Sequence, residues 1–258
     1  MASDVTLEGV KKVVFFPFKG EKWAIKALIG SALFFLCSFI PIIPAIPLDG
    51  YFVRIMKRII LQDEDPALPE WDDWGTLFLD GIKLLGVTFI YLLPALILTT
   101  GGYILFMILD LSMVFSIPSQ TSAPSNLLPS ITLSMLGMFG GLIIVMLGMG
   151  LMYITLLIIP PAVGNMIARD SFGAAFQIKD WWPVFKANLS GYILAIALGI
   201  GLISLAYIVC AFLYMTIILW ILLPFVFSFI IFVFGTISFS LYAVAYRDGL
   251  RKLQVRQA

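Results

Sequence analysis

The chain contains no histidine, and only two cysteines, Cys37 and Cys210, occur among its 258 residues. The absence of histidine removes the most common general base, the most common metal ligand and the usual pH-responsive side chain. Two isolated cysteines in apolar runs are typical of small buried hydrophobic residues, not of a metal site or a disulfide. We therefore expect no catalytic residue, no metal and no cofactor, and we expect that the protein is not an enzyme.

Charge is scarce as well, because 12% of the residues are charged and 61% are hydrophobic. Soluble domains carry about a quarter charged residues. Two stretches, residues 111–168 and 187–246, contain no charged residue at all. About 20 apolar helical residues cross a bilayer core, so each stretch can hold two spans, or one span with an apolar loop. The pattern predicts an integral membrane protein, and a net charge of +1 gives no overall field for nucleic acid.

The basic residues are distributed unevenly along the chain, and this predicts the topology. Lysines and arginines gather at residues 11–26, 54–58, 83, 169–186 and 247–256, whereas residues 110–130 contain none. The positive-inside rule assigns basic segments to the cytoplasm. We therefore expect both termini in the cytoplasm and the Ser/Pro-rich loop 116–130 outside.

The first uncharged window, residues 27–48, has basic residues at both ends, so the chain should enter and leave on the same side. Pro41, Pro44 and Pro47 predict the bend, because proline breaks the interior of a helix. The arms would cover about residues 22–40 and 48–61. The second arm is short and charged, so a fully spanning and a re-entrant hairpin both remain open.

Together these features predict an all-α fold: a polytopic integral membrane helical bundle of three helical hairpins. Four full spans, at about residues 82–108, 131–159, 191–215 and 222–246, would follow the Pro-bent or re-entrant hairpin. We expect one membrane domain, 1–258, with these parts: cytoplasmic segment 1–21, hairpin 22–62, interfacial segment 63–81, second hairpin 82–159, interfacial segment 160–190, third hairpin 191–246 and cytoplasmic tail 247–258.

An acidic and aromatic cluster is the most distinctive string, and it consists of Glu70, Trp71, Asp72, Asp73 and Trp74. Several carboxylates in a row could bind a divalent cation at a lipid headgroup. Acidic residues also stabilise the start of a helix, and tryptophan prefers the membrane interface. We favour the second interpretation.

A basic stripe precedes this cluster on an otherwise apolar helix, and it consists of Arg54, Lys57 and Arg58. Such a stripe is typical of a segment that lies against anionic lipid, where each charge contributes about 1 kcal/mol. The stripe could equally serve only to orient the chain. Both interpretations stay open, and they are compatible.

Small residues recur at intervals of four, at Gly191, Ala195 and Gly199 and again at Gly137 and Gly141. This spacing lets two helices approach closely, so we expect these faces to pack against other helices. A ligand groove is the alternative.

The positions of the charged residues relative to the predicted spans also bear on the function. Outside the short second arm of the first hairpin, no charged residue lies in the middle of a predicted span, although ion-coupled transporters usually need one. We therefore expect a non-catalytic scaffold, assembly factor or lipid-organising protein. The alternative is a transporter or channel-like protein for a neutral or lipidic substrate, which Pro-broken helices favour. Expected partners are membrane lipids, anionic lipids among them, and a second copy or another membrane protein, but not nucleic acid.

The string LPEWDDWGTLFLDGIK (68–83), with GYFVRIMKRI before it and IYLLPALIL after it, resembles the signature of a prokaryotic membrane-protein family. The segments FPFKGEKWAIKALIGS and SFGAAFQIKDWWPVFKANLSGY are similar to it as well. The family is catalogued as domain of unknown function 4013. The resemblance implies a multi-pass protein of a bacterial or archaeal plasma membrane, and it supplies no activity, substrate or site residue.

Overall fold

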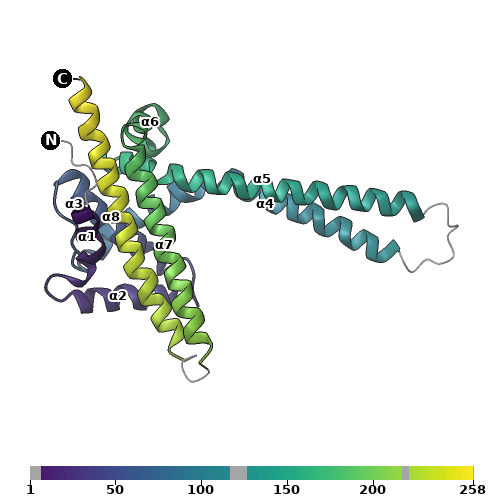
Figure 1. Cartoon of the computed structure of the whole chain (residues 1–258), viewed down its shortest axis with the longest axis horizontal. Coiled ribbons are helices and arrows are strands. Elements are labelled where there is room, and N and C mark those ends of the chain that lie inside the picture. The colour runs from purple at the N-terminus through teal and green to yellow at the C-terminus, as the bar shows by residue number, and fades with distance from the viewer. Residues whose placement is uncertain (1–6, 117–126, 217–220, 258) are drawn as a thin grey trace. The chain divides into compact units, whose positions relative to one another are not determined.

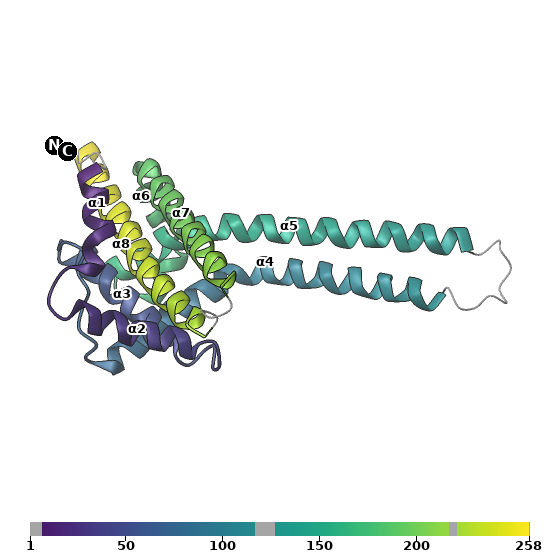
Figure 2. The same ribbon diagram turned by 60° about the horizontal axis from the view of Figure 1, so that its bottom comes forward.

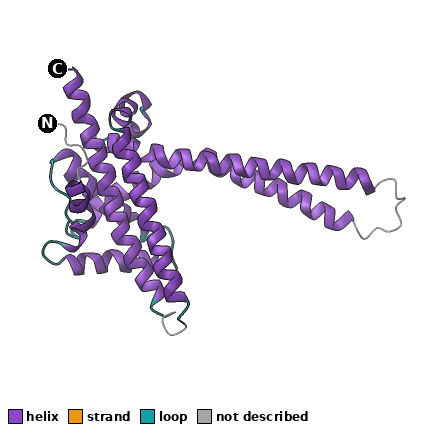
Figure 3. Cartoon of the chain, in the orientation of Figure 1, coloured by secondary structure: helices purple, strands orange, loops and turns teal. Residues whose placement is uncertain are grey.

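The computed structural model describes residues 7–116, 127–216 and 221–257. The regular structure in these ranges is helical throughout, as Figure 3 shows. The elements in chain order are α1 (Leu7–Phe15), the 3₁₀ helix η1 (Phe16–Phe18), α2 (Trp23–Leu36), α3 (Ala45–Leu61), α4 (Trp74–Ser116), α5 (Leu127–Ala168), the 3₁₀ helix η3 (Phe172–Phe176), α6 (Ile178–Ala187), α7 (Leu189–Tyr214) and α8 (Leu223–Gln257).

Four helices in the described ranges are long and apolar enough to cross a membrane: Trp74–Leu111 in α4, Ser134–Ala168 in α5, α7, and Leu223–Arg256 in α8. The 14 residues of α2 would reach only about 21 Å at 1.5 Å per residue, which is less than a bilayer core. The prediction of an all-α membrane fold, with four spans after a shorter N-terminal hairpin, is therefore confirmed.

The helices extend further than the sequence suggested. The prediction ended the second full span at about residue 159, just before Pro160 and Pro161, but α5 continues through both prolines to Ala168. Each proline removes one backbone hydrogen bond, and buried packing on the C-terminal side of the prolines can offset that loss. The residues that follow, 162–167, are all buried. Likewise α8 continues through the predicted tail to Gln257.

The chain divides into two compact units. The first consists of Met1–Val87 and Ile159–Ala258, and the second consists of Thr88–Ile158. The loop predicted to lie outside, residues 116–130, falls largely beyond the described residues, since 117–126 are not described.

The first unit is built around α8, which packs against α7, α2, α3 and α6. Figures 1 and 2 both show α7 and α8 side by side as a hairpin. The ring of Phe232 lies directly against Gly30 of α2, and Phe239 stacks on Phe52 of α3 with ring centroids 4.7 Å apart. Aromatic side chains of α8 therefore fill the space between α8 and two other helices, α2 and α3.

Two glycines let α3 cross the first turns of α4 at very short range. A Cβ atom on Gly50 would lie 1.9 Å from the carbonyl oxygen of Leu77. A Cβ atom on Gly81 would lie 1.8 Å from the carbonyl oxygen of Ile46. Both glycines follow an aspartate, Asp49 and Asp80, so two DG steps meet at the crossing. No larger residue fits there unless a backbone moves.

The second unit is a pair of helices, the later part of α4 and the earlier part of α5. A Cβ atom on Gly141 would lie 3.0 Å from the backbone of Gly102, and Gly148 packs against Thr99. Gly137 lies against Leu109. In each of the two long helices only 11% of the most apolar window is buried. Apolar side chains cover most of this surface, as contact with lipid requires.

The predicted small-residue face of α7 is buried. Ala195 and Gly199 are both covered, and Gly191 lies against the side chain of Asn188. At Gly199, a Cβ atom would lie 3.5 Å from Ser238 Oγ and 3.8 Å from the hydroxyl of Tyr242. The neighbour of this face is therefore α8.

We predict that Gly199→Leu lowers the thermal stability in detergent by about 1–3 kcal/mol, because a leucine cannot fit between α7 and α8. Gly201→Leu is the matched control, since Gly201 is exposed and has no atom within 4 Å of its Cβ position. Equal melting temperatures for the two variants would contradict the packing of this face.

We also predict that Gly50→Ala is strongly destabilising, because the added methyl group meets backbone that cannot rotate away. Gly75→Ala should be neutral or slightly stabilising, since Gly75 is exposed in the first turn of α4 and alanine favours helix. Thermal unfolding of both variants tests this, and a Gly50→Ala protein that melts like wild type would show that the helices do not cross there.

Candidate functional site

The loop between α3 and α4, residues 62–73, is the most highly charged segment of the chain. Six of its twelve residues are acidic and none is basic, so its carboxylates need cations from elsewhere. We call this segment the acidic loop. Its acidic residues are Asp63, Glu64, Asp65, Glu70, Asp72 and Asp73.

Five of the six carboxylates form ion pairs with four different helices. Lys12 of α1 binds Asp65 at 2.6 Å, and Lys26 of α2 binds Glu70 at 2.8 Å. On α3, Arg54 pairs with Asp72 and Arg58 pairs with Glu64. On α8, Arg247 and Arg251 both reach Asp63, at 3.2 and 2.5 Å. The acidic loop therefore joins segments from both ends of the chain.

The sixth carboxylate begins α4. Asp73 has φ of 46°, in the left-handed region that aspartate tolerates better than most residues. It accepts hydrogen bonds from the hydroxyl and the backbone N–H of Thr76. The hydrogen bonds from Thr76 hold the pKa of Asp73 below its usual range. The predicted role of this acid in starting a helix matches its geometry.

Aromatic stacking holds the middle of the acidic loop against the bundle. Trp71 stacks on Tyr51 of α3 with ring centroids 4.0 Å apart, and Phe232 of α8 lies beside both rings. The indole of Trp71 donates a hydrogen bond to the carbonyl oxygen of Lys26, and the hydroxyl of Tyr51 donates one to that of Pro69. Trp74 lies next to Trp71, at 5.8 Å between ring centroids. These tryptophans are part of the packing of the first unit.

One residue of the basic stripe, Arg54, joins it to the acidic cluster, although the sequence predicted the two as separate features. Arg54 also donates to the carbonyl oxygens of Glu70 and Asp73. The charges of Arg54 and Arg58 are thus balanced inside the chain. Binding of lipid headgroups by the stripe stays a prediction, but it must now compete with these pairs. Among the described residues, no group of three or more Cys, Asp or Glu side chains could hold a metal ion.

Lys57 pairs with a deeply buried carboxylate. Its ammonium group lies 2.8 Å from both carboxylate oxygens of Asp80 in α4. The side chain of Asp80 is 5% exposed, and that of Lys57 is 27% exposed. A cavity of about 10 Å³ beside the pair has room for about one water molecule. Removal of one partner would leave the other as an uncompensated buried charge.

A second polar cluster, where α5, η3 and the residue between α6 and α7 meet α8, was not found from the sequence. The side chain of Asn165 donates to the carbonyl oxygen of Ala174 and accepts from the hydroxyl of Tyr246. Asn188 donates to the carbonyl oxygen of Ala245 and accepts from Lys252. The two asparagines, each in a largely apolar part of the sequence, could have indicated this cluster. A buried side-chain amide needs partners for both its NH₂ group and its carbonyl oxygen.

We predict that Lys57→Met destabilises the protein by about 3–5 kcal/mol, because Asp80 is left buried without a cation. The double variant Lys57→Met/Asp80→Leu should recover most of this loss. Lys12→Met is the control, since its pair with Asp65 is exposed and such pairs contribute about 0–1 kcal/mol. A Lys57→Met protein that melts like Lys12→Met would contradict the buried pair.

The comparison with known proteins agrees with the resemblance seen in the sequence. The profile of a family described as "Protein of unknown function (DUF4013)" matches residues 33–215, which is more than half of the chain. The match includes the acidic loop and the small-residue face of α7. No curated protein and no solved structure matched the chain. The chain therefore belongs to the DUF4013 family of proteins of unknown function.

Proposed function

We propose that this protein is a non-catalytic membrane protein that organises lipid, or that scaffolds or assembles other membrane proteins. The observation that carries the proposal is the closed packing of the first unit. Its acidic loop finds its cations within the chain, and its aromatic side chains fill the space around α8. A bundle packed in this way offers surfaces on which lipids or other membrane proteins can bind.

Polar side chains inside the bundle support the same conclusion. Ser228, Thr236 and Ser240 of α8 are buried, and each hydroxyl donates to a carbonyl oxygen of its own helix. A hydroxyl whose proton is bonded within its own helix needs no polar solute as a partner for that proton. The partners that fit are membrane lipids, a second copy of the chain or another membrane protein.

We further propose that the protein lies in the plasma membrane of a bacterium or archaeon, with both termini in the cytoplasm. The lysine and arginine asymmetry supports this orientation. Contacts within the first unit support it too, because Lys12, the acidic loop and Arg251 lie together and so belong on one side of the membrane.

Cysteine labelling tests this topology. In a variant without native cysteines, a cysteine at position 64 or 180 should be protected from an impermeant maleimide in intact cells, and both should react after lysis. A cysteine at position 122 should react in intact cells. Labelling at position 64 but not at position 122 in intact cells would contradict this topology and indicate the opposite orientation.

A transporter for neutral or lipidic solutes is the second candidate, and one observation favours it. Pro94 lies inside α4 and Pro160 and Pro161 lie inside α5, and prolines within spans often lie near binding sites in transporters.

A paired experiment separates the two candidates. Native purification in mild detergent should recover the protein with bound lipid or with a stoichiometric membrane-protein partner. In proteoliposomes, glycerol-driven swelling and the flipping of a fluorescent lipid should proceed as in protein-free liposomes. Faster swelling or flipping, without any co-purifying lipid or protein, would overturn the proposal in favour of transport.

A further inference from the structure

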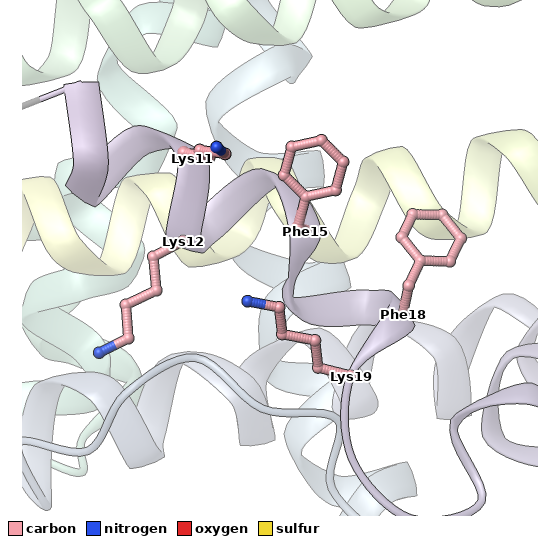
Figure 4. A pocket seen from close by; sticks show the side chains of 5 residues that line it. All are labelled: Lys11, Lys12, Phe15, Phe18 and Lys19. Carbon is pink, nitrogen blue, oxygen red and sulfur yellow. The ribbon is translucent and has the colours of Figure 1, made fainter.

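An open groove of about 550 Å³ lies on the N-terminal segment, and Figure 4 shows its lining. Lys11, Lys12 and Lys19 supply three ammonium groups, and Phe15 and Phe18 supply two phenyl rings. The two rings project side by side from the chain, and the ammonium group of Lys19 turns back towards α1 (Figure 4). The groove therefore combines a cationic side with an apolar side. Its volume lies within the range of small-molecule sites.

The side chains that the structure describes do not balance all the charges of this groove. Lys12 pairs with Asp65, but Lys11 and Lys19 form no ion pair or side-chain hydrogen bond with any residue whose side chain is described. The basic stripe of α3 differs, because Arg54, Lys57 and Arg58 all have carboxylate partners. Of these two basic segments, the one with cations available to an outside anion is therefore the groove on α1 and beside η1, and not the stripe on α3.

The apolar side of the groove continues onto a membrane-type surface. Phe15 and Phe18 are 50% and 43% exposed. Phe18 packs edge-on against Trp23, the first residue of α2, and the outer face of α2 exposes Ile25 and Leu28. Lysines next to exposed aromatic rings at the start of an apolar helix are typical of the headgroup region of a bilayer.

We propose that this groove binds the phosphate of an anionic phospholipid headgroup through Lys11 and Lys19, with the lipid's acyl chains along Phe15, Phe18 and the outer face of α2. Charge complementarity selects an anion, and the exposed phenyl rings select an anion that carries hydrocarbon. This inference deepens the lipid-organising part of the proposed function and rests on it.

The test uses the full-length protein in detergent and native mass spectrometry of bound lipid. Phosphatidylglycerol and phosphatidylcholine with identical acyl chains are titrated separately, and inorganic phosphate is added as a competitor. Wild type should bind one phosphatidylglycerol more tightly than phosphatidylcholine. The affinity of the Lys11→Gln/Lys19→Gln variant for phosphatidylglycerol should be lower by about tenfold or more. Phe15→Ser should weaken the binding of both lipids, and millimolar inorganic phosphate should displace neither lipid.

The control variant Lys179→Gln/Arg256→Gln removes two exposed charges elsewhere and should bind phosphatidylglycerol like wild type. Equal binding by the two double variants would overturn the proposal. Displacement by inorganic phosphate would also overturn it, since the groove would then be a general anion site. Melting temperatures of all variants should match wild type, because the altered side chains are exposed. The swelling and flipping assays measure transport independently of this groove. If the groove does not bind phosphatidylglycerol, the scaffold or assembly function is therefore tested separately by those assays.

Discussion

Neutralisation of the acidic loop is the constraint on which the first unit depends. Six carboxylates within twelve residues repel one another, and no cation within the loop can offset them. The structure brings Lys12, Lys26, Arg54, Arg58, Arg247 and Arg251 to them from four helices. Exposed pairs contribute only about 0–1 kcal/mol each. Their main effect is therefore to select the one arrangement in which α1, α2, α3 and α8 meet.

Apolar packing supplies the stability that these pairs do not. Trp71 extends from the acidic loop onto Tyr51, and Phe232 of α8 lies against both rings. The same Phe232 fills the space above Gly30 of α2. One side chain of α8 thus contacts the loop, α2 and α3 at once. The charged end and the apolar interior of the unit are continuous, which explains why a short acidic string carries so many aromatic residues.

The sequence predicted the spans well because the absence of charge is a local property that needs no knowledge of the fold. It did not predict the pairing of Asp63 with Arg251, since 188 residues separate the two. The basic stripe and the acidic cluster were each recognised, but the pairing of Arg54 with Asp72 depends on how α3 and α4 cross at Gly50 and Gly81. Local rules also misplaced the end of α5, because buried packing after Pro160 and Pro161 overrides the tendency of proline to end a helix.

Zero-length carbodiimide cross-linking tests the central claim most directly, because it joins a carboxylate to a lysine amine only where the two are already in contact. Lys26 Nζ lies 2.8 Å from Glu70, and Lys12 Nζ lies 2.6 Å from Asp65. Mass spectrometry of the digested protein should therefore find amide links between Lys26 and Glu70 and between Lys12 and Asp65. Lys26→Arg keeps the charge and should remove the first link alone. Links from the acidic loop to other lysines, or none at all, would contradict the account.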